Sequence, residues 1–174
     1  MALINTTTTG VLGSTFFGDG TGSLTVQQNG VTLGTYGNIP AFKATLGSSQ
    51  NITASTWTKY AGSVEAFDTN NNYDSSTNYR FTPTIAGYYY VKFANWFTTG
   101  TSVVAASIYK NGSPAITEYD SQVSGTTVRA DGLIFMNGTS DYLEAFVLQS
   151  SGGTLALDSA SVNPGFSAYL VKAA

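Results

Sequence analysis

The stretch FTPTIAGYYYVKFANWF, residues 81–97, sets three consecutive tyrosines behind a proline and a glycine. Successive side chains of a β-strand point to opposite faces of its sheet. We therefore expect a strand over residues 87–97 whose two faces both carry aromatic rings. The face with Tyr89, Val91 and Phe93 is the better core face. The face with Tyr88, Tyr90, Lys92 and Trp96 is too aromatic for solvent alone, so it is a candidate contact surface.

The composition also favours a covered surface. Charged residues make up 10% of the chain, against about 25% in an average soluble domain. The chain holds 11 tyrosines and 10 phenylalanines, and it is rich in Thr, Ser, Gly and Asn. Charge normally keeps a monomer soluble and protects its sheet edges. We therefore expect partners to cover much of the surface; a neutral, hydroxyl-rich monomer is the alternative.

Several partner classes are disfavoured by simple counts. The seven basic residues are scattered from Lys43 to Lys172, so there is no basic stripe for nucleic acid. No apolar run approaches the roughly 20 residues of a membrane helix, and the first residues lack the pattern of a signal peptide. We expect no nucleic acid partner and no membrane insertion. The absence of cysteine removes disulfides and thiolate metal sites.

Short alternating runs separated by Gly, Asn, Ser and Pro predict an all-β sandwich or barrel. Asn29-Gly30 and Asn111-Gly112 each predict a tight hairpin turn, because Asn-Gly tolerates positive φ at both positions. Asn137-Gly138 has a longer loop. We expect strands near residues 41–46, 51–54, 64–67, 79–82, 87–97, 103–110, 115–119, 127–136, 142–149 and 165–172.

A boundary is expected near Pro40. Residues 1–39 would form a Thr/Gly-rich arm and a small hairpin, and residues 40–174 the main domain. A hairpin is marginal alone, so this segment needs a surface to dock on. We predict that the arm attaches the protein to a partner through its apolar side chains, which are Leu3, Ile4, Val11, Leu12, Phe16 and Phe17.

Several motifs of residues 40–174 resemble the C1q-like globular domain, a relative of the tumour necrosis factor fold. Pro40-Ala-Phe-Lys-Ala is similar to its first strand. Its central signature is similar to three segments of this chain, namely Asn71-Asn-Asn-Tyr73, Tyr79-Arg-Phe81-Thr-Pro83 and Gly87-Tyr-Tyr-Tyr. Tyr109-Lys-Asn-Gly112 matches its central hairpin, and Phe166-Ser-Ala-Tyr-Leu170 its closing strand. The resemblance implies a ten-stranded, two-sheet jelly roll that forms a homotrimer, with Phe81 and Phe166 in the core.

The sequence departs from this family pattern in two places. Asn137-Gly-Thr-Ser-Asp141-Tyr-Leu-Glu inserts two residues before the penultimate strand, where the family usually has Gly-Asp. No collagen-like Gly-X-Y segment precedes the domain. The resemblance implies no particular activity, because one fold serves many unrelated functions.

Catalytic chemistry is not indicated. Without His or Cys, the usual acyl-transfer dyads and triads cannot be built. Glycan cleavage needs a carboxylate pair, and Glu65, Glu118 and Glu144 lie in no suggestive motif. A hard cation could bind loop oxygens within residues 68–74, although a plain Asn/Asp-rich loop explains that stretch better. We therefore expect no enzyme activity, no catalytic residue, no metal and no cofactor.

The expected function is that of a bacteriophage virion structural protein. C1q-like trimers behind Thr/Gly-rich arms and hairpins resemble phage appendage and decoration modules. We expect a trimeric capsid decoration (cement) protein that is assembled in the host cytoplasm and grips the major capsid protein or other virion proteins. One alternative is a tail-fibre, spike or head-fibre tip that binds a host protein or surface glycan; another is a secreted C1q-like binding module.

Overall fold

The computed structural model describes residues 24–28, 31–36, 39–98, 102–122, 127–160 and 164–174. These residues form β-strands, turns and loops only, and they include no helix that is long and apolar enough to span a membrane. Backbone contacts divide the chain into two units, residues 1–39 and residues 40–174. The predicted arm residues, from Leu3 to Phe17, lie outside the described residues.

In the first unit, β1 (Leu24–Gln28) pairs antiparallel with β2 (Val31–Tyr36). The register starts with Leu24 opposite Tyr36 and shifts between Val26 and Gln27. The two strands are those expected on either side of Asn29-Gly30, a dipeptide that lies outside the described residues.

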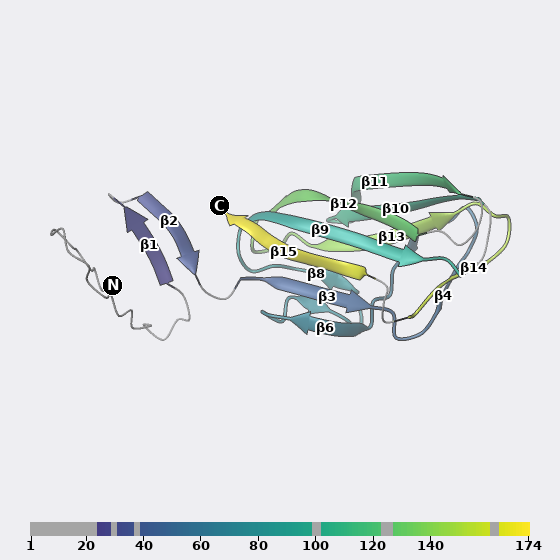
Figure 1. Ribbon diagram of the computed structural model, residues 1–174, viewed down its shortest axis with the longest axis horizontal. Coiled ribbons are helices and arrows are strands. Elements are labelled where there is room, and N and C mark those ends of the chain that lie inside the picture. Colours follow the sequence, from purple (N-terminus) through teal and green to yellow (C-terminus); the bar gives the residue numbers. More distant parts are fainter. Residues whose placement is uncertain (1–23, 29–30, 37–38, 99–101, 123–126, 161–163) are drawn as a thin grey trace. The chain divides into compact units, whose positions relative to one another are not determined.

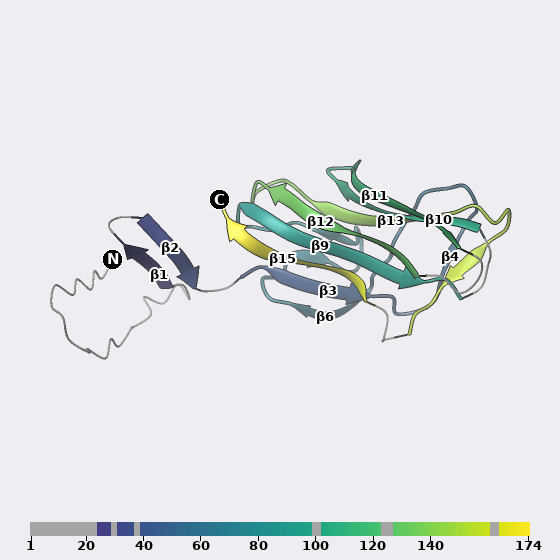
Figure 2. The same cartoon turned by 45° about the horizontal axis from the view of Figure 1, so that its top comes forward.

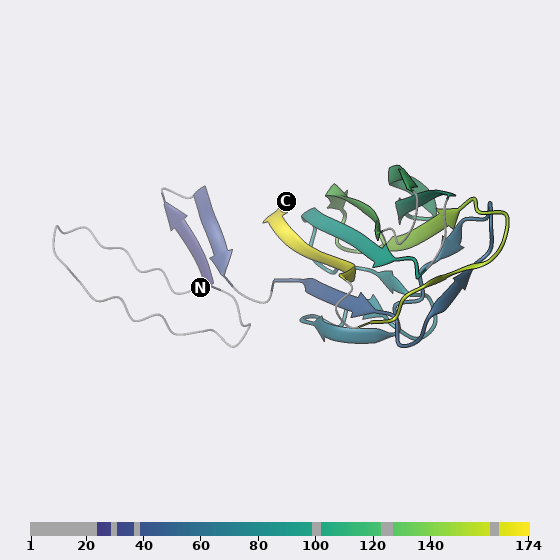
Figure 3. The same ribbon diagram turned by 45° about the vertical axis from the view of Figure 1, so that its right-hand side comes forward.

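A five-stranded antiparallel sheet forms one layer of the second unit. Its order is β12-β9-β15-β3-β6, and Figures 1 and 2 show these strands side by side. In Figure 3, the yellow C-terminal strand β15 runs between teal β9 and blue β3. The bounds are β3 Ala41–Thr45, β6 Val64–Asp68, β9 Gly87–Trp96, β12 Thr127–Met136 and β15 Gly165–Ala173.

A six-stranded sheet packs against the first. Its order is β11-β10-β13-β8-β7, and β5 pairs with β13 beside this path. The bounds are β5 Thr58–Lys59, β7 Tyr73–Asp74, β8 Arg80–Phe81, β10 Ser102–Lys110, β11 Ser113–Gln122 and β13 Leu143–Gln149. A small ribbon pairs β4 (Gln50–Ile52) with β14 (Leu155–Leu157). The sequence did not predict the short strands β5, β7 and β14.

Aromatic rings fill the space between the two sheets. Phe42 on β3 stacks on both Tyr73 and Phe81, with ring centroids 4.5 Å apart in each case, and Phe166 meets Phe42 edge-on at 5.1 Å. Because such ring pairs add to the stabilisation from buried area, this cluster joins β3 and β15 of one sheet to β7 and β8 of the other. All five residues expected in the core are fully buried, namely Phe81, Tyr89, Val91, Phe93 and Phe166.

The hydroxyl groups of the buried tyrosines form hydrogen bonds within the domain. Tyr73 Oη donates to the Gly62 carbonyl at 3.0 Å, and Tyr89 Oη donates to the Ile85 carbonyl at 2.8 Å. Burial raises the pKa of Tyr60 and of Tyr89 to about 12, so both phenols stay protonated at neutral pH. A satisfied polar tip is what allows a tyrosine to serve as a core residue.

Gly87 begins β9 where the last strand crosses closest to it. A Cβ atom at this position would lie 2.3 Å from the Lys172 carbonyl oxygen and 2.9 Å from the Ala173 Cα. Both atoms belong to the backbone of β15, so neither can move aside cheaply. The glycine before the three tyrosines therefore permits β15 to pair with β9 as far as the first residue of β9.

We expect Gly87→Ala to destabilise the domain by about 1–3 kcal/mol or more, the range for overpacked positions, as measured by urea unfolding. Gly153→Ala is the matched control, because a Cβ at Gly153 would meet nothing within 4 Å. Equal midpoints for the two variants would show that the close approach is not a constraint.

Candidate interaction surface

The surface of the five-stranded sheet that points away from the core is the candidate site, and we call it the outer aromatic face. Alternation along β9 gives it the four residues predicted as a contact surface, which are Tyr88, Tyr90, Lys92 and Trp96. The same alternation adds Arg129, Asp131, Leu133 and Phe135 from β12, and Tyr169 from β15. Val171 follows Tyr169 at a register shift between Leu170 and Lys172.

Strand register brings the rings of this face together. Tyr90 lies opposite Leu133 on one side and Tyr169 on the other, and the Tyr90 and Tyr169 ring centroids are 5.7 Å apart. Tyr88 lies opposite Phe135, and these rings meet edge-on at 5.4 Å. The apolar side chains thus form one continuous patch across three strands.

This patch is open to solvent in the single chain. Leu133 is 60% exposed, Val171 53%, and Tyr88 and Tyr169 50% each. Isolated exposed apolar residues are ordinary on protein surfaces, but a contiguous group of them marks an interaction site. The outer aromatic face has the properties of such a site.

Charged groups border the patch at its β12 edge. Lys92 lies opposite Asp131, whose carboxylate accepts a 2.7 Å hydrogen bond from Tyr90 Oη; this bond raises the pKa of Tyr90. A groove of about 540 Å³ lies here, lined by Lys92, Glu118, Tyr119, Asp120, Thr127, Val128, Arg129 and Asp131. Within the described part of the chain, no ion pair involves Lys92 or Arg129. Both cations can therefore pair with a partner.

The contact surface is wider than the sequence analysis predicted. Alternation along the strand expected at residues 87–97 identified only the β9 residues of this face. It did not identify Leu133, Phe135, Tyr169 or Val171. The same alternation applied to the predicted strands 127–136 and 165–172 would have found the first three. Val171 requires the register shift in β15, which has no clear signature in the sequence.

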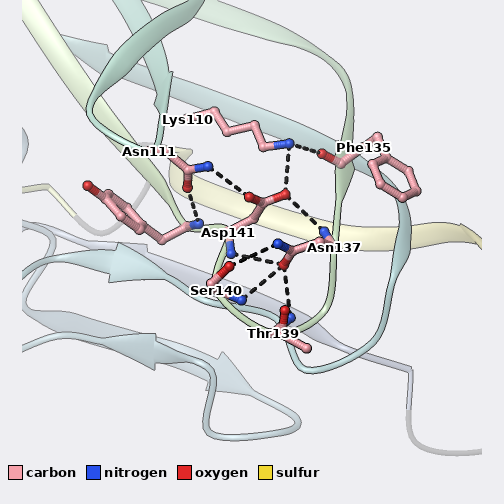
Figure 4. A network of polar contacts seen from close by, with 8 residues as sticks. Lys110, Asn111, Phe135, Asn137, Thr139, Ser140 and Asp141 are labelled. Atoms are coloured by element: carbon pink, nitrogen blue, oxygen red, sulfur yellow. Dashed lines mark hydrogen bonds and ion pairs between the residues drawn. The ribbon is translucent and has the colours of Figure 1, made fainter.

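A polar network fixes one end of this face (Figure 4). The Asp141 carboxylate accepts hydrogen bonds from Asn111 Nδ2 at 2.7 Å and from the Asn137 backbone N–H at 2.9 Å. It also pairs with Lys110 Nζ at 2.8 Å. Asp141 therefore ties the turn between β10 and β11 to the loop between β12 and β13.

The network reaches the outer aromatic face through Lys110. Its Nζ donates to the Phe135 carbonyl at 2.7 Å and lies 5.9 Å from the centre of the Phe135 ring. Asn137 Oδ1 accepts backbone N–H bonds from Thr139, Ser140 and Asp141 at 2.9 to 3.0 Å. The two inserted residues of this loop are thus held by a side-chain cap, and Phe135 keeps a fixed position.

Residues 68–74 were considered as a cation site. Their carboxylates instead accept hydrogen bonds from nearby backbone N–H groups. Asp68 accepts the backbone N–H groups of Asn70 and Tyr73 at 3.2 and 2.7 Å. Asp74 accepts those of Ser76, Thr77 and Asn78 at 2.9 to 3.1 Å, and these bonds hold its pKa well below the usual range. In the residues that the structure describes, no cluster of three or more acidic, His or Cys side chains could hold a metal ion.

Two animal proteins are among the solved structures with the same architecture. The globular domain of zebrafish complement 1qA aligns with a TM-score of 0.51 at 14% identity, over 78% of this chain and 99% of that one. Eiger TNF from S. frugiperda aligns with a TM-score of 0.60 at 8% identity, over 78% of this chain and 93% of that one. The chain has the C1q/TNF-like jelly-roll fold.

The predicted all-β, C1q/TNF-like jelly roll is thereby confirmed, whereas the predicted ten strands and the homotrimer stay predictions. At these identities the likeness shows the fold alone. No protein-family model matches the chain, and no curated protein matches it. The function of this C1q/TNF-like domain therefore has to be argued from its own surfaces.

We expect Asp141→Asn to lower stability at pH 7 by about 1–3 kcal/mol, because the buried carboxylate loses its charge-assisted bonds to Lys110, Asn111 and the Asn137 N–H. Lys110 and Asn111 hold the pKa of Asp141 below its ordinary value of 3.8. A depressed carboxyl pKa gives stability that is present above the ordinary value and is lost as pH falls through the folded value.

The difference between wild type and Asp141→Asn should therefore be large at pH 7 and should shrink below about pH 4, as measured by chemical unfolding at each pH. Exposed Glu65→Gln serves as the control and should change stability little at either pH. A gap between wild type and Asp141→Asn that is the same at pH 7 and pH 3 would refute this role of Asp141.

Proposed function

We propose that this C1q/TNF-like protein is a non-enzymatic assembly module that associates with two further copies of itself through the outer aromatic face, and that it serves as a decoration (cement) protein of a bacteriophage capsid. The observation that carries self-association is the continuous exposed patch of rings and aliphatic side chains over β12, β9 and β15. The resemblance to C1q-like domains implies that three copies associate.

The chemistry of the face suits another copy of the same chain. Tyrosine, tryptophan and phenylalanine are enriched in protein interfaces because they bury large areas. The bordering groove carries carboxylates of Glu118 and Asp120 and cations of Lys92 and Arg129. Such a self-complementary mixture of signs allows the cations of one copy to pair with carboxylates of the next.

A binding role agrees with the side chains that are present. The chain has no His and no Cys, and in the described residues the well-ordered carboxylates, such as Asp68, Asp74 and Asp141, are occupied as caps. Stabilised caps serve the fold and offer no free general base. These facts support a module that works by contact.

Capsid decoration is the more specific part of the proposal. A low-charge chain with a Thr/Gly-rich N-terminal segment suits assembly in the host cytoplasm and attachment to the major capsid protein. Leu3, Ile4, Val11, Leu12, Phe16 and Phe17 would supply the apolar contacts to the shell. The mature location would be the virion.

The mass of the purified protein should correspond to three chains by analytical ultracentrifugation. We expect Leu133→Glu to yield monomers, because it places a charge on the face that the trimer would bury while leaving the fold intact at a 60% exposed position. Val103→Glu, on the other sheet and 40% exposed, is the matched control and should remain trimeric. A stable wild-type monomer at micromolar concentration would rule out the self-association proposal.

Deleting residues 1–23 should abolish binding to undecorated capsids while the trimer persists, as measured by co-sedimentation of capsids with purified protein. Truncated protein that still co-sediments would show that the arm is not the attachment device. If full-length protein is instead found at the tail and adsorbs to host cells, the fibre or spike tip is the better assignment.

A further inference from the structure

A second group of aromatic rings lies on the opposite side of the domain, on the outward surface of the six-stranded sheet. Tyr109 on β10 stacks on Phe146 of β13 with centroids 4.1 Å apart. Trp57, just before β5, lies 6.4 Å from the Tyr109 ring and 6.5 Å from the Tyr119 ring of β11. We call Trp57, Tyr109, Tyr119 and Phe146 the ring platform.

Small residues beneath the platform fix its position. Ala105 and Ser107 alternate with the core residues of β10 and so point outward, yet both are fully buried. Ala105 lies opposite Tyr119, and Ser107 lies opposite Phe146. The rings therefore rest on a surface of small side chains. Preorganised aromatic surfaces bind ligands without a large ordering cost.

The polar groups under the rings are already satisfied. Ser107 Oγ bonds the Ile116 carbonyl at 3.0 Å and lies 2.8 Å from the Thr117 hydroxyl. The ring edges and phenol groups are thus what the platform offers to a ligand. Tyr119 is the most accessible of them, with 66% of its surface exposed. Burial and the neighbouring Tyr119 raise the pKa of Tyr109. Like any tyrosine hydroxyl, this phenol can donate and accept hydrogen bonds.

The platform carries little free charge on its own side of the sheet. Tyr119 also lines the charged groove beside the outer aromatic face, but alternation along β11 directs Glu118 and Asp120 to the opposite side of the sheet from the Tyr119 ring. Lys59 Nζ, 5.8 Å from the centre of the Phe146 ring, pairs with Glu144 Oε1 at 2.6 Å. Each of these two charges neutralises the other. An anionic polymer or an acidic membrane would need unpaired cations here. The outer aromatic face differs, because unpaired charges of both signs border it.

A neutral surface of rings and phenols complements one chemical class well. The C–H faces of sugar rings pack against aromatic rings, and sugar hydroxyls exchange hydrogen bonds with tyrosine hydroxyls and the tryptophan N–H. We propose that the ring platform is a binding site for neutral glycans, with Tyr119 and Trp57 stacking on the sugar rings. This site lies on a different sheet from the outer aromatic face and does not depend on the capsid role.

Titration calorimetry with cellotetraose, maltotetraose and chitotetraose, together with saturation-transfer NMR, tests the proposal. At least one tetrasaccharide should bind with a Kd in the millimolar range or tighter. Tyr119→Ala should weaken that binding about fivefold or more, in line with the value of an aromatic contact, while Tyr119→Phe should stay within about twofold to threefold. Trp57→Ala should weaken binding and Trp57→Phe should restore part of it.

Three results would overturn the proposal: no saturable binding of any of the three sugars, binding unchanged in Tyr119→Ala, or binding lost in Leu133→Glu with Tyr119→Ala unaffected. Because Tyr119 is highly exposed, its variants should fold as wild type does. The mass of each sample separates this test from the self-association test. A monomer that binds sugar through Tyr119 supports the glycan site and contradicts only the trimer.

Discussion

The strict alternation of β9 between two sheet neighbours is the constraint on which the rest of this structure depends. β9 pairs with β12 on one side and with β15 on the other. Each of its side chains must therefore lie on one of the two faces of the sheet. Tyr89, Val91 and Phe93 are committed to the core. Tyr88, Tyr90 and Trp96 are committed to the opposite surface by the same geometry. The three consecutive tyrosines therefore force the domain to have an aromatic exterior.

The aromatic rings of the core come from both sheets and pack against one another. Phe42, Tyr73 and Phe81 stack in one column, and Phe166 closes it from the side. Tyr60 meets Phe93 at 4.8 Å and receives a 3.3 Å hydrogen bond from buried Asn95. Large rings fill space with few rotatable bonds, and their polar tips find partners within the sandwich. The domain thus remains well packed with few charged groups.

The sequence alone supported the fold class and the longer strands, because period-two alternation over seven or more residues is a strong local signal. β5, β7 and β14 were missed because two or three residues carry no periodicity. The capping role of Asp141 could not be foreseen, since its partners at 110 and 111 are distant in sequence. The outer aromatic face was predicted only for β9, because its extent depends on which strands are neighbours. The ring platform likewise arises from four separate segments.

The Asp141 network has a consequence for the lifetime of the folded state. It joins groups about thirty residues apart, so its bonds can form only after the β10–β11 turn and the loop between β12 and β13 have come together. Interactions made late on the folding route are absent from the transition state, and they slow unfolding more than they speed folding. We expect Asp141, with Lys110 and Asn111, to make such late contacts. Such contacts would lengthen the half-life of the folded domain more than they would raise its folding rate.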